Sequence, residues 1–415
     1  MRNLFNAKPL RREGASRSSF ASSLLCVFAL LLSASAASAQ IAVKGDTIWT
    51  MAGEPITNGV VLVNANGKIE AVGTAASVNI PANYRVINAK VVTPGLIDAH
   101  TVIGLNGYLN QPHDQMGIDG GASFQPELRA TDSYNSEEKL VEFVRQFGVT
   151  TIHTGHQPSA LASGQTMIAK TWGKNVDEAT IVPTAMIAVT LGNAANATGR
   201  SPGTRAKQVA MLRSELIMAQ ENLTKPDAPK DLKSQIMARV IKREIPLLIT
   251  AEAAQDIMTA LRVAKEFNIK IVLDGASDAH TLINEIKASG FPVIVHATMA
   301  RPGGERANLS LENASKLRSA GIPIALQSGY EGYVPKTRVV LYEAAMAAAN
   351  GLGRRDALAA ITIDAAKILG LDNRIGSLAV GKDADIAMYD GDPFEWTSHC
   401  TGTIINGKVV SEIIR

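Results

Sequence analysis

Cysteine is the rarest residue of this 415-residue chain, which contains only Cys26 and Cys400. So few cysteines exclude a fold that is held together by many disulfide bonds. Apolar residues make up 46% of the chain and charged residues 19%, which also excludes a disordered or collagen-like protein. The length suffices for one large domain, or for one large and one small domain, with an ample core. The sequence therefore predicts a globular protein.

The first 39 residues have the pattern of a secretory signal. Five basic residues precede an apolar run at positions 24–32, and the small-residue stretch SASAASAQ follows. This order predicts cleavage near Ala39/Gln40 and a periplasmic or secreted protein. The apolar run is well short of the roughly 20 residues that a membrane span needs, so we expect no membrane span in the mature chain. Cys26 leaves with the signal, which rules out an internal disulfide.

Removal of the signal also removes the excess of positive charge. The whole chain has 41 basic and 38 acidic residues, and residues 1–39 hold five of the former and one of the latter, which leaves 36 against 37 and a net charge of −1. A nearly neutral mature chain offers no sign of a basic surface for nucleic acid or for an anionic membrane. We expect neither as a partner.

Both ends of the mature chain are predicted to form strands. Residues 41–92 contain DTIWTM and GVVLVNANGKIEAVG, whose Asn66-Gly67 pair is a strong hairpin signal. The end of the chain repeats this pattern in DADIAMYDG and GTIINGKVV, where Asn406-Gly407 marks a second turn. The simplest arrangement is a small composite β-sandwich built from residues 40–92 and 379–415, with a larger domain inserted between them.

The inserted domain, residues 93–378, alternates short apolar runs with amphipathic helices. IPLLITAE is followed by a helix in which Ile257, Ala260, Leu261 and Ala264 recur at helical spacing. KIVLDG, PVIVHAT and PIALQSG are the next strand candidates, and no phosphate-binding GxGxxG follows a strand. This regular alternation predicts an α/β fold with a (β/α)8 TIM barrel, in which chemistry sits at the carboxyl ends of the strands.

Three motifs carry a family resemblance. VTPGLIDAH at the first barrel strand, GSLAVGKDADIAMYDGDPF near the end and the closing INGKVV resemble the amidohydrolase superfamily, in particular its imidazolonepropionase-like and Xaa-Pro dipeptidase-like branch. The resemblance covers essentially the whole mature chain. It implies a distorted TIM barrel with a composite β-sandwich. It also implies hydrolysis of C–N bonds in amides, cyclic amides or dipeptides by a metal-activated water.

The resemblance also implies a set of metal ligands, which this chain has largely lost. The family takes them from His-x-His after strand 1, one histidine each after strands 5 and 6, and an aspartate after strand 8. Carried over residue by residue, the first ligand is His100, and the other positions are occupied by Val102, Thr250, Gly275 and Gly329. The stretch MIAVTLGN, where binuclear members supply a bridging Lys or Glu, has neither.

Four replaced ligands leave little basis for the family's chemistry. A bound Zn²⁺ lowers the pKa of its water from 15.7 to about 7. A full site is worth about 10–16 kcal/mol, or roughly 3–4 kcal/mol per ligand, so one histidine would hold the metal only in about the millimolar range. We therefore predict a pseudoenzyme without a cofactor. It would be a homo-oligomer, a hetero-oligomer with an active amidohydrolase paralogue, or a small-molecule binder.

An active hydrolase with a rebuilt site is the alternative. Ionisable residues still stand at strand ends: His153, His156, Glu252, Asp274 and His296. Together with His100, the two histidines His153 and His156 would be candidate ligands for zinc or another divalent metal. Glu252, Asp274 and His296 would be candidate catalytic acids or bases. If no site has been rebuilt, each of these residues is a hydrogen-bonded polar side chain that lines the barrel mouth.

The remaining histidines have no expected role as ligands. His280 opens a helix, and His399 lies near the β-sandwich. His113 lies in the long Gly-rich loop NQPHDQMGIDGGASFQPELRATDSYN. Such a loop shapes a substrate mouth or a subunit interface, and the sequence leaves both open.

Overall fold

The structure is a computed structural model that describes residues 40–196, 202–227, 229–296, 301–330 and 339–415. The signal sequence expected at residues 1–39 lies outside these ranges. Within them, no helix is both long and apolar enough to cross a membrane.

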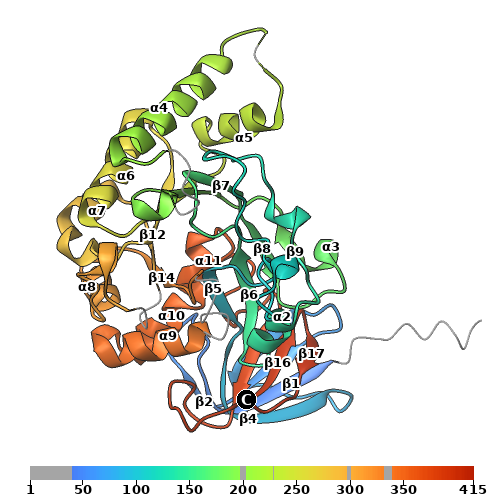
Figure 1. Cartoon of the computed structure of the whole chain (residues 1–415). Helices are drawn as coiled ribbons and strands as arrows, with labels where there is room; N and C mark the ends of the chain where they lie inside the picture. The colour runs from blue at the N-terminus through green and yellow to red at the C-terminus, as the bar shows by residue number, and fades with distance from the viewer. Residues whose placement is uncertain (1–39, 197–201, 228, 297–300, 331–338) are drawn as a thin grey trace, which may run out of the picture.

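Strands from both ends of the chain join in one seven-stranded sheet of order β17-β16-β15-β4-β1-β2-β3 (Figure 1). Its strands are β1 (Ile41–Ile48), β2 (Ile56–Val63), β3 (Ile69–Thr74), β4 (Arg85–Pro94), β15 (Ile386–Tyr389), β16 (Cys400–Ile405) and β17 (Lys408–Ser411). The two ends are joined where β15 pairs with β4 in antiparallel fashion, with Ile386 opposite Pro94. This β-rich part therefore depends on strands that lie almost 300 residues apart in the sequence.

The two Asn-Gly pairs form turns in this sheet, and the turns contact each other. One lies between the antiparallel strands β2 and β3, the other between β16 and β17. Gly67 has a φ of +71°, and Asn406 and Gly407 have φ values of +49° and +73°. A Cβ on Gly67 would lie 2.1 Å from the carbonyl oxygen of Asn406. A glycine is therefore required at position 67 both by its backbone conformation and by the approach of the other turn.

The barrel strands belong to two sheets, of order β14-β13-β12-β11-β10-β7 and β5-β6-β8-β9. They are β5 (Leu96–Thr101), β6 (Val149–Thr154), β7 (Ala162–Gln165), β8 (Met167–Lys170), β9 (Thr180–Val182), β10 (Ile187–Thr190), β11 (Leu247–Ala251), β12 (Ile271–Gly275), β13 (Val293–Val295) and β14 (Ile324–Leu326). β7 and β8 flank Thr166 in one extended segment that pairs with β10 and with β6, so this segment links the sheets. On the opposite side, a parallel bridge between Thr101 and Gly329 joins β5 to the residues after β14.

One barrel segment departs from the regular alternation that the sequence suggested. β10 to β14 run parallel, as do β5 and β6, but β7 and β8 are antiparallel to their neighbours. β8, which pairs with β6, follows it after residues 155–166, and this connection contains β7 but no helix. A parallel return usually uses a crossover helix, so the chain comes back antiparallel. This connection without a helix is the physical reason for the distortion of the barrel.

Helices cover the outside of the barrel (Figure 1). They are α2 (Lys139–Arg145), α3 (Val176–Ala179), α4 (Arg205–Asn222), α5 (Leu232–Ile241), α6 (Ala254–Phe267), α7 (Ile283–Ser289), α8 (Asn313–Ser319), α9 (Val340–Ala347), α10 (Arg354–Ala360) and α11 (Ile363–Ile368). The predicted helix after IPLLITAE is α6, which buries Ile257, Ala260 and Ala264 and is followed by Asn268 in the left-handed conformation. Its apolar stripe faces the strands, as its helical spacing indicated.

Candidate functional site

The candidate site is a polar layer on top of an apolar layer inside the barrel. Four successive strands contribute one residue each to an apolar cluster: Leu248, Val272, Ile294 and Ala325. Because side chains alternate along a strand, the same face carries a second set two residues further on: Thr250, Asp274, His296 and Gln327. These four residues are also buried. The sequence-predicted Asp274 and His296 therefore face the interior at the carboxyl ends of their strands.

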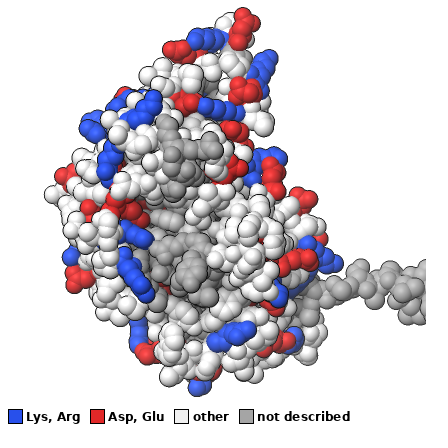
Figure 2. Space-filling model, viewed as in Figure 1, with Lys and Arg blue, Asp and Glu red and all other residues white. Residues whose placement is uncertain are grey.

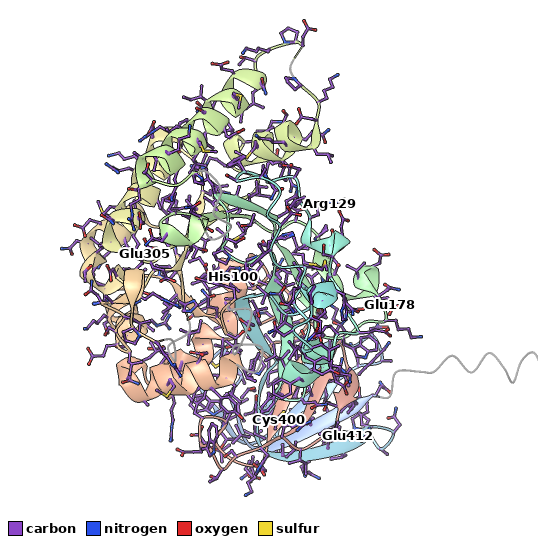
Figure 3. All side chains as sticks on the ribbon, in the orientation of Figure 1. His100, Arg129, Glu178, Glu305, Cys400 and Glu412 are labelled. Carbon is purple, nitrogen blue, oxygen red and sulfur yellow. The ribbon has the colours of Figure 1, made fainter. Side chains whose placement is uncertain are left out.

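Asp274 is the centre of this layer. Its carboxylate accepts hydrogen bonds from Thr250 Oγ1 at 2.6 Å and from Gln327 Nε2 at 2.7 Å, and it lies 2.9 Å from Nδ1 of His100. Figure 3 shows His100 inside the barrel, far from the labelled β-sheet residue Cys400. We call these four residues, Asp274, His100, Thr250 and Gln327, the Asp274 cluster. Its members tie β5, β11, β12 and the end of β14 together.

The environment of Asp274 keeps it ionised despite complete burial. Burial by itself raises the pKa of this carboxyl, but the adjacent His100 and the hydrogen bonds from His100 and Thr250 outweigh that effect. The pKa of Asp274 is therefore lower than its ordinary value. A buried carboxylate with three hydrogen-bonding neighbours is a satisfied group.

His153 lies next to the cluster but is fully hydrogen-bonded elsewhere. Its ring centre is 5.8 Å from that of His100. Nδ1 lies 2.7 Å from the carbonyl oxygen of Ala99, to which it donates, and Nε2 lies 2.6 Å from Oγ1 of Thr166. Burial, followed by the neighbouring His100, lowers the pKa of His153 to about 3. His153 is thus a neutral ring whose two nitrogens are both engaged.

Glu252 and His296, two further candidates, are connected to the cluster through Tyr330. The carboxylate of Glu252 accepts hydrogen bonds from Ser277 Oγ at 2.6 Å and from the Tyr330 hydroxyl at 3.3 Å. The Tyr330 ring lies 5.2 Å from the ring of His100 and 5.0 Å from that of His296. Burial, and then the charge of Glu252, raises the pKa of Tyr330 well above its ordinary value. Tyr330 is therefore a neutral donor that packs against both imidazole rings.

His156 lies outside this group. Within the described residues it makes no hydrogen bond to the Asp274 cluster, and its Nδ1 lies beside Gly164. Burial lowers the pKa of His156, and the charge of Asp119 opposes this shift only in part.

The other histidines also lie elsewhere. His280 Nδ1 contacts the carbonyl oxygen of Ser277, and His399 contacts Asp390. His113 lines a pocket of about 350 Å³ together with Tyr108, Met116 and Lys139.

The four positions at which the resemblance implies a ligand that this chain lacks differ in what fills them. Val102 is buried apolar surface, and Thr250 donates its hydroxyl proton to Asp274. Gly275 and Gly329 have φ values of +74° and +92°, a region that favours glycine. A Cβ on Gly275 would also lie 2.9 Å from Oε1 of Glu252. At these two glycines the backbone itself, and not only the side chain, is unsuited to a histidine or an aspartate.

The residues present do not fit the metal that the family resemblance implies. A zinc site needs three or four N, O or S ligands arranged around an open position. Throughout the described part of the chain, no group of three or more His, Cys, Asp or Glu side chains is arranged to hold a metal ion. His100, the one ligand residue that the resemblance retains, contacts Asp274 through its Nδ1.

Two features of the site were missed by sequence reasoning. Gln327 completes the Asp274 cluster, and Asp98 accepts a hydrogen bond from the backbone N–H of Ser328 at 3.0 Å and another from its hydroxyl. Burial is the main reason why the pKa of Asp98 is raised to about 7. Counting two residues on from Ala325 would have placed Gln327 on the inner face. No local signal in the sequence points to the pairing of Asp98 with Ser328.

Comparison with known proteins shows to which family the chain belongs. The profile of the amidohydrolase family matches residues 105–411, so the chain belongs to that family. The fold agrees, since a crystal structure of an amidohydrolase from Thermotoga maritima MSB8 superposes with a TM-score of 0.84 at 26% identity, covering 90% of this chain and 100% of that one.

Curated relatives are similar over most of the chain. The imidazolonepropionase of Fusobacterium nucleatum is 25% identical over an alignment of 417 residues, gaps included. The alignment covers 86% of this chain and 92% of that protein. The imidazolonepropionase of Brucella anthropi is 24% identical over 383 residues, 85% of this chain and 91% of that protein. A putative prolidase from Bifidobacterium longum shares the fold at a TM-score of 0.56 and 19% identity, covering 90% of this chain and 95% of that one.

Proposed function

We propose that this chain is an exported amidohydrolase-fold protein that has lost metal-dependent C–N bond hydrolysis and acts as a pseudoenzyme. Its role would be that of a partner in an oligomer, with an active paralogue or with itself, or that of a small-molecule binder. The observation that carries the proposal is the Asp274 cluster. His100 and Thr250, which stand at two positions where the family resemblance implies metal ligands, both contact the Asp274 carboxylate.

The energetics support the loss of the metal. If each ligand contributes roughly 3–4 kcal/mol, His100 alone supports only about millimolar affinity. Nδ1 of His100 lies against Asp274, so the ring can offer a metal only its Nε2. The cluster therefore supplies one nitrogen, where a zinc site needs three or four ligands.

The backbone argues against an easy return to the family's site. Gly275 and Gly329 adopt left-handed conformations in which a non-glycine residue costs about 1–2 kcal/mol. Restoring the histidine and the aspartate would require local changes in the main chain at two strand ends. Export is supported separately, by the signal-like pattern of residues 1–39.

Metal analysis of the purified mature chain tests the proposal. After expression in zinc-supplemented medium and gel filtration, we expect clearly less than one equivalent of zinc, manganese, iron or cobalt. We also expect no hydrolysis of dipeptides or cyclic amides above the background of a mock purification. An imidazolonepropionase prepared in parallel serves as the positive control. One tightly bound metal equivalent together with chelator-sensitive hydrolysis would refute the proposal.

A metal-independent hydrolase is a second candidate function, and the environment of His100 favours it. Nε2 of His100 is buried and has no hydrogen-bond partner among the described residues, while Nδ1 is oriented by Asp274. A carboxylate that orients an imidazole is the arrangement of a general base. Hydrolysis that persists in EDTA and falls at least 100-fold in Asp274→Asn would support this candidate. Equal background activity in both proteins would exclude it.

A further inference from the structure

A groove of about 590 Å³ lies on the outside of the barrel between α6 and α7, which are neighbours in space (Figure 1). We call it the α6–α7 groove. Ile269 and Phe291 line it, and each stands two positions before the first residue of a barrel strand, β12 or β13. The groove therefore lies toward the amino ends of the strands, whereas the Asp274 cluster lies at their carboxyl ends.

One part of the groove is apolar. Met258 and Leu261 line it from α6, and Ala288 of α7 and Phe291 line it as well. Met258, Leu261 and Phe291 are only half-buried, so each keeps part of its side chain open to solvent. A ligand with an apolar body would remove this surface from water, which is favourable. Small-molecule sites typically combine such surface with a few polar groups that fix the ligand's orientation.

The polar groups of the groove include three exposed cations, Arg243, Arg262 and Lys265. Arg262 and Lys265 follow Met258 by four and seven positions, so all three share one face of α6. Arg243 is held in place because its Nη1 donates to the carbonyl oxygen and to Oδ1 of Asn268, at 2.7 Å each. Its guanidinium therefore stands at the groove in a fixed position, with further N–H groups for an anionic ligand.

These three cations form no ion pair within the described residues, unlike cations nearby. Arg213 pairs with Glu266, and Lys233 pairs with Glu215. Cations and anions are also interspersed over the face of the molecule that Figure 2 shows. The lining of the groove has a single carboxylate, that of Glu285. Three positive charges against one negative charge favour an anion in the groove.

We propose that the α6–α7 groove binds a small organic anion with an apolar body, of the class of medium-chain carboxylates. The carboxylate lies at the cations, and the alkyl chain covers Leu261 and Phe291. A polyanion without an apolar part would leave these side chains in water, and an uncharged apolar molecule would leave the cations without a partner. The proposal is independent of the loss of catalysis, because the groove lies outside the Asp274 cluster.

Isothermal titration calorimetry of the full mature chain tests the proposal with octanoate, 1-octanol and acetate. We expect octanoate to bind one-to-one with a submillimolar dissociation constant. 1-Octanol lacks the charge and acetate lacks the apolar chain, so each should bind roughly 10-fold more weakly or worse. An increase in sodium chloride from about 50 to about 500 mM should weaken octanoate binding, because salt screens exposed charges.

Substitutions in the groove locate the bound octanoate. Arg262→Gln combined with Lys265→Gln should weaken binding by roughly 10-fold. Lys287→Gln is the matched control, since Lys287 is an exposed lysine of α7 outside the groove lining, and it should leave binding unchanged. Ala288→Trp should weaken binding by filling the groove without a change of charge. Glu285→Gln should strengthen binding by about 2- to 5-fold, because it removes the like charge.

The gain expected for Glu285→Gln separates this site from a general effect on folding, since a misfolded variant would not bind more tightly. Thermal unfolding without ligand should be unchanged in the variants with exposed substitutions. Absence of octanoate binding, or equal binding of octanoate and 1-octanol, would overturn the proposal. So would octanoate binding that persists unchanged both in Ala288→Trp and in the variant without Arg262 and Lys265, because the ligand would then lie elsewhere. None of these outcomes affects the metal analysis that tests the proposed function.

Discussion

Thr250 and Asp274 stand opposite each other on the neighbouring strands β11 and β12, and the Thr250 hydroxyl donates a 2.6 Å hydrogen bond to the Asp274 carboxylate. The family resemblance implies a metal ligand at position 250. The threonine that stands there helps to hold an anion. The relationship gives the buried carboxylate a fixed partner within the sheet, and it makes the first prediction straightforward.

Thr250→Val should destabilise the protein by about 1–3 kcal/mol, because a buried carboxylate loses one of its donors while the shape of the side chain is kept. Urea unfolding of the purified variant measures the change. Thr259→Val is the control, because Thr259 is a half-buried residue of α6 whose hydroxyl contacts no buried carboxylate; it should stay within about 0.5 kcal/mol of the wild type. Equal losses of unfolding free energy at the two positions would mean that the hydrogen bond from Thr250 to Asp274 adds no stability of its own.

Gly275→Ala should cost more stability than Gly290→Ala. Both glycines have nearly the same positive φ, +74° and +71°, but only at Gly275 would the added Cβ meet another group, the Glu252 carboxylate. We expect a difference of about 1–3 kcal/mol between the two variants in urea unfolding. Adding Glu252→Ala to Gly275→Ala should remove most of this difference. Additive effects of the two changes would argue against the contact.

The ionisation of Asp98 should lower the free energy of unfolding as the pH rises from about 4 to about 7. The pKa of Asp98 is about 7 in the folded chain against an ordinary 3.8, so in this range the folded state holds more protons than the unfolded state. Since one pKa unit corresponds to about 1.4 kcal/mol, the full loss is on the order of 4 kcal/mol. The wild type should therefore lose unfolding free energy between pH 4 and 8, and Asp98→Asn should not show this loss. The stability of the variant relative to the wild type should thus increase with pH. A constant difference would contradict this assignment.

Asp383 provides a control of opposite sign for the pH experiment. Burial raises its pKa, but Lys170, Lys68 and Arg374 outweigh that effect and hold the pKa below its ordinary value. Its contribution to stability is therefore present above pH 3.8 and is lost as the pH falls. Asp383→Asn should be most damaging at neutral pH and approach the wild type in acid.

Gly67→Ala should weaken the β-rich part of the protein, because the added Cβ would meet the carbonyl of Asn406 in the opposite turn. Gly381→Ala is a matched control, since Gly381 also has a positive φ, +88°, but no neighbouring atom within 4 Å of the added Cβ. We expect Gly67→Ala to lower the unfolding free energy by about 1–3 kcal/mol more than the control. Hydrogen exchange of β2, β3, β16 and β17 would locate the change.

Sequence periodicity was sufficient for most of the barrel. α6 follows from the spacing of Ile257, Ala260 and Ala264, and the apolar runs before Glu252 and at Asp274 are β11 and β12. The antiparallel course of β7 and β8 was not predicted, because strand direction depends on the length of a connection and on the neighbouring strands. Nothing in ALASGQTMIAK itself specifies with which strand it pairs.

The candidate site was only half visible in the sequence. His100, Asp274 and the vacated positions could be located because they lie at fixed offsets in recognisable strands. The partnership of His100 with Asp274 and that of Asp98 with Ser328 join residues 174 and 230 positions apart. Such pairs form only when the strands close around a common interior, so no local pattern records them. His153 and His156 illustrate the same limit, since they are three residues apart but lie in different environments.

The sequence by itself determined the family, the strand-rich ends and the positions that depart from the ligand pattern implied by the resemblance, because these follow from local motifs and periodicity. Only the tertiary structure decided what surrounds those positions. It brought Thr250, Gln327 and His100 around the Asp274 carboxylate, and it set Gly275 and Gly329 in left-handed conformations. The physical reason is that a buried charge must find its partners in three dimensions. Which partners are available depends on how the strands of the barrel are placed beside one another.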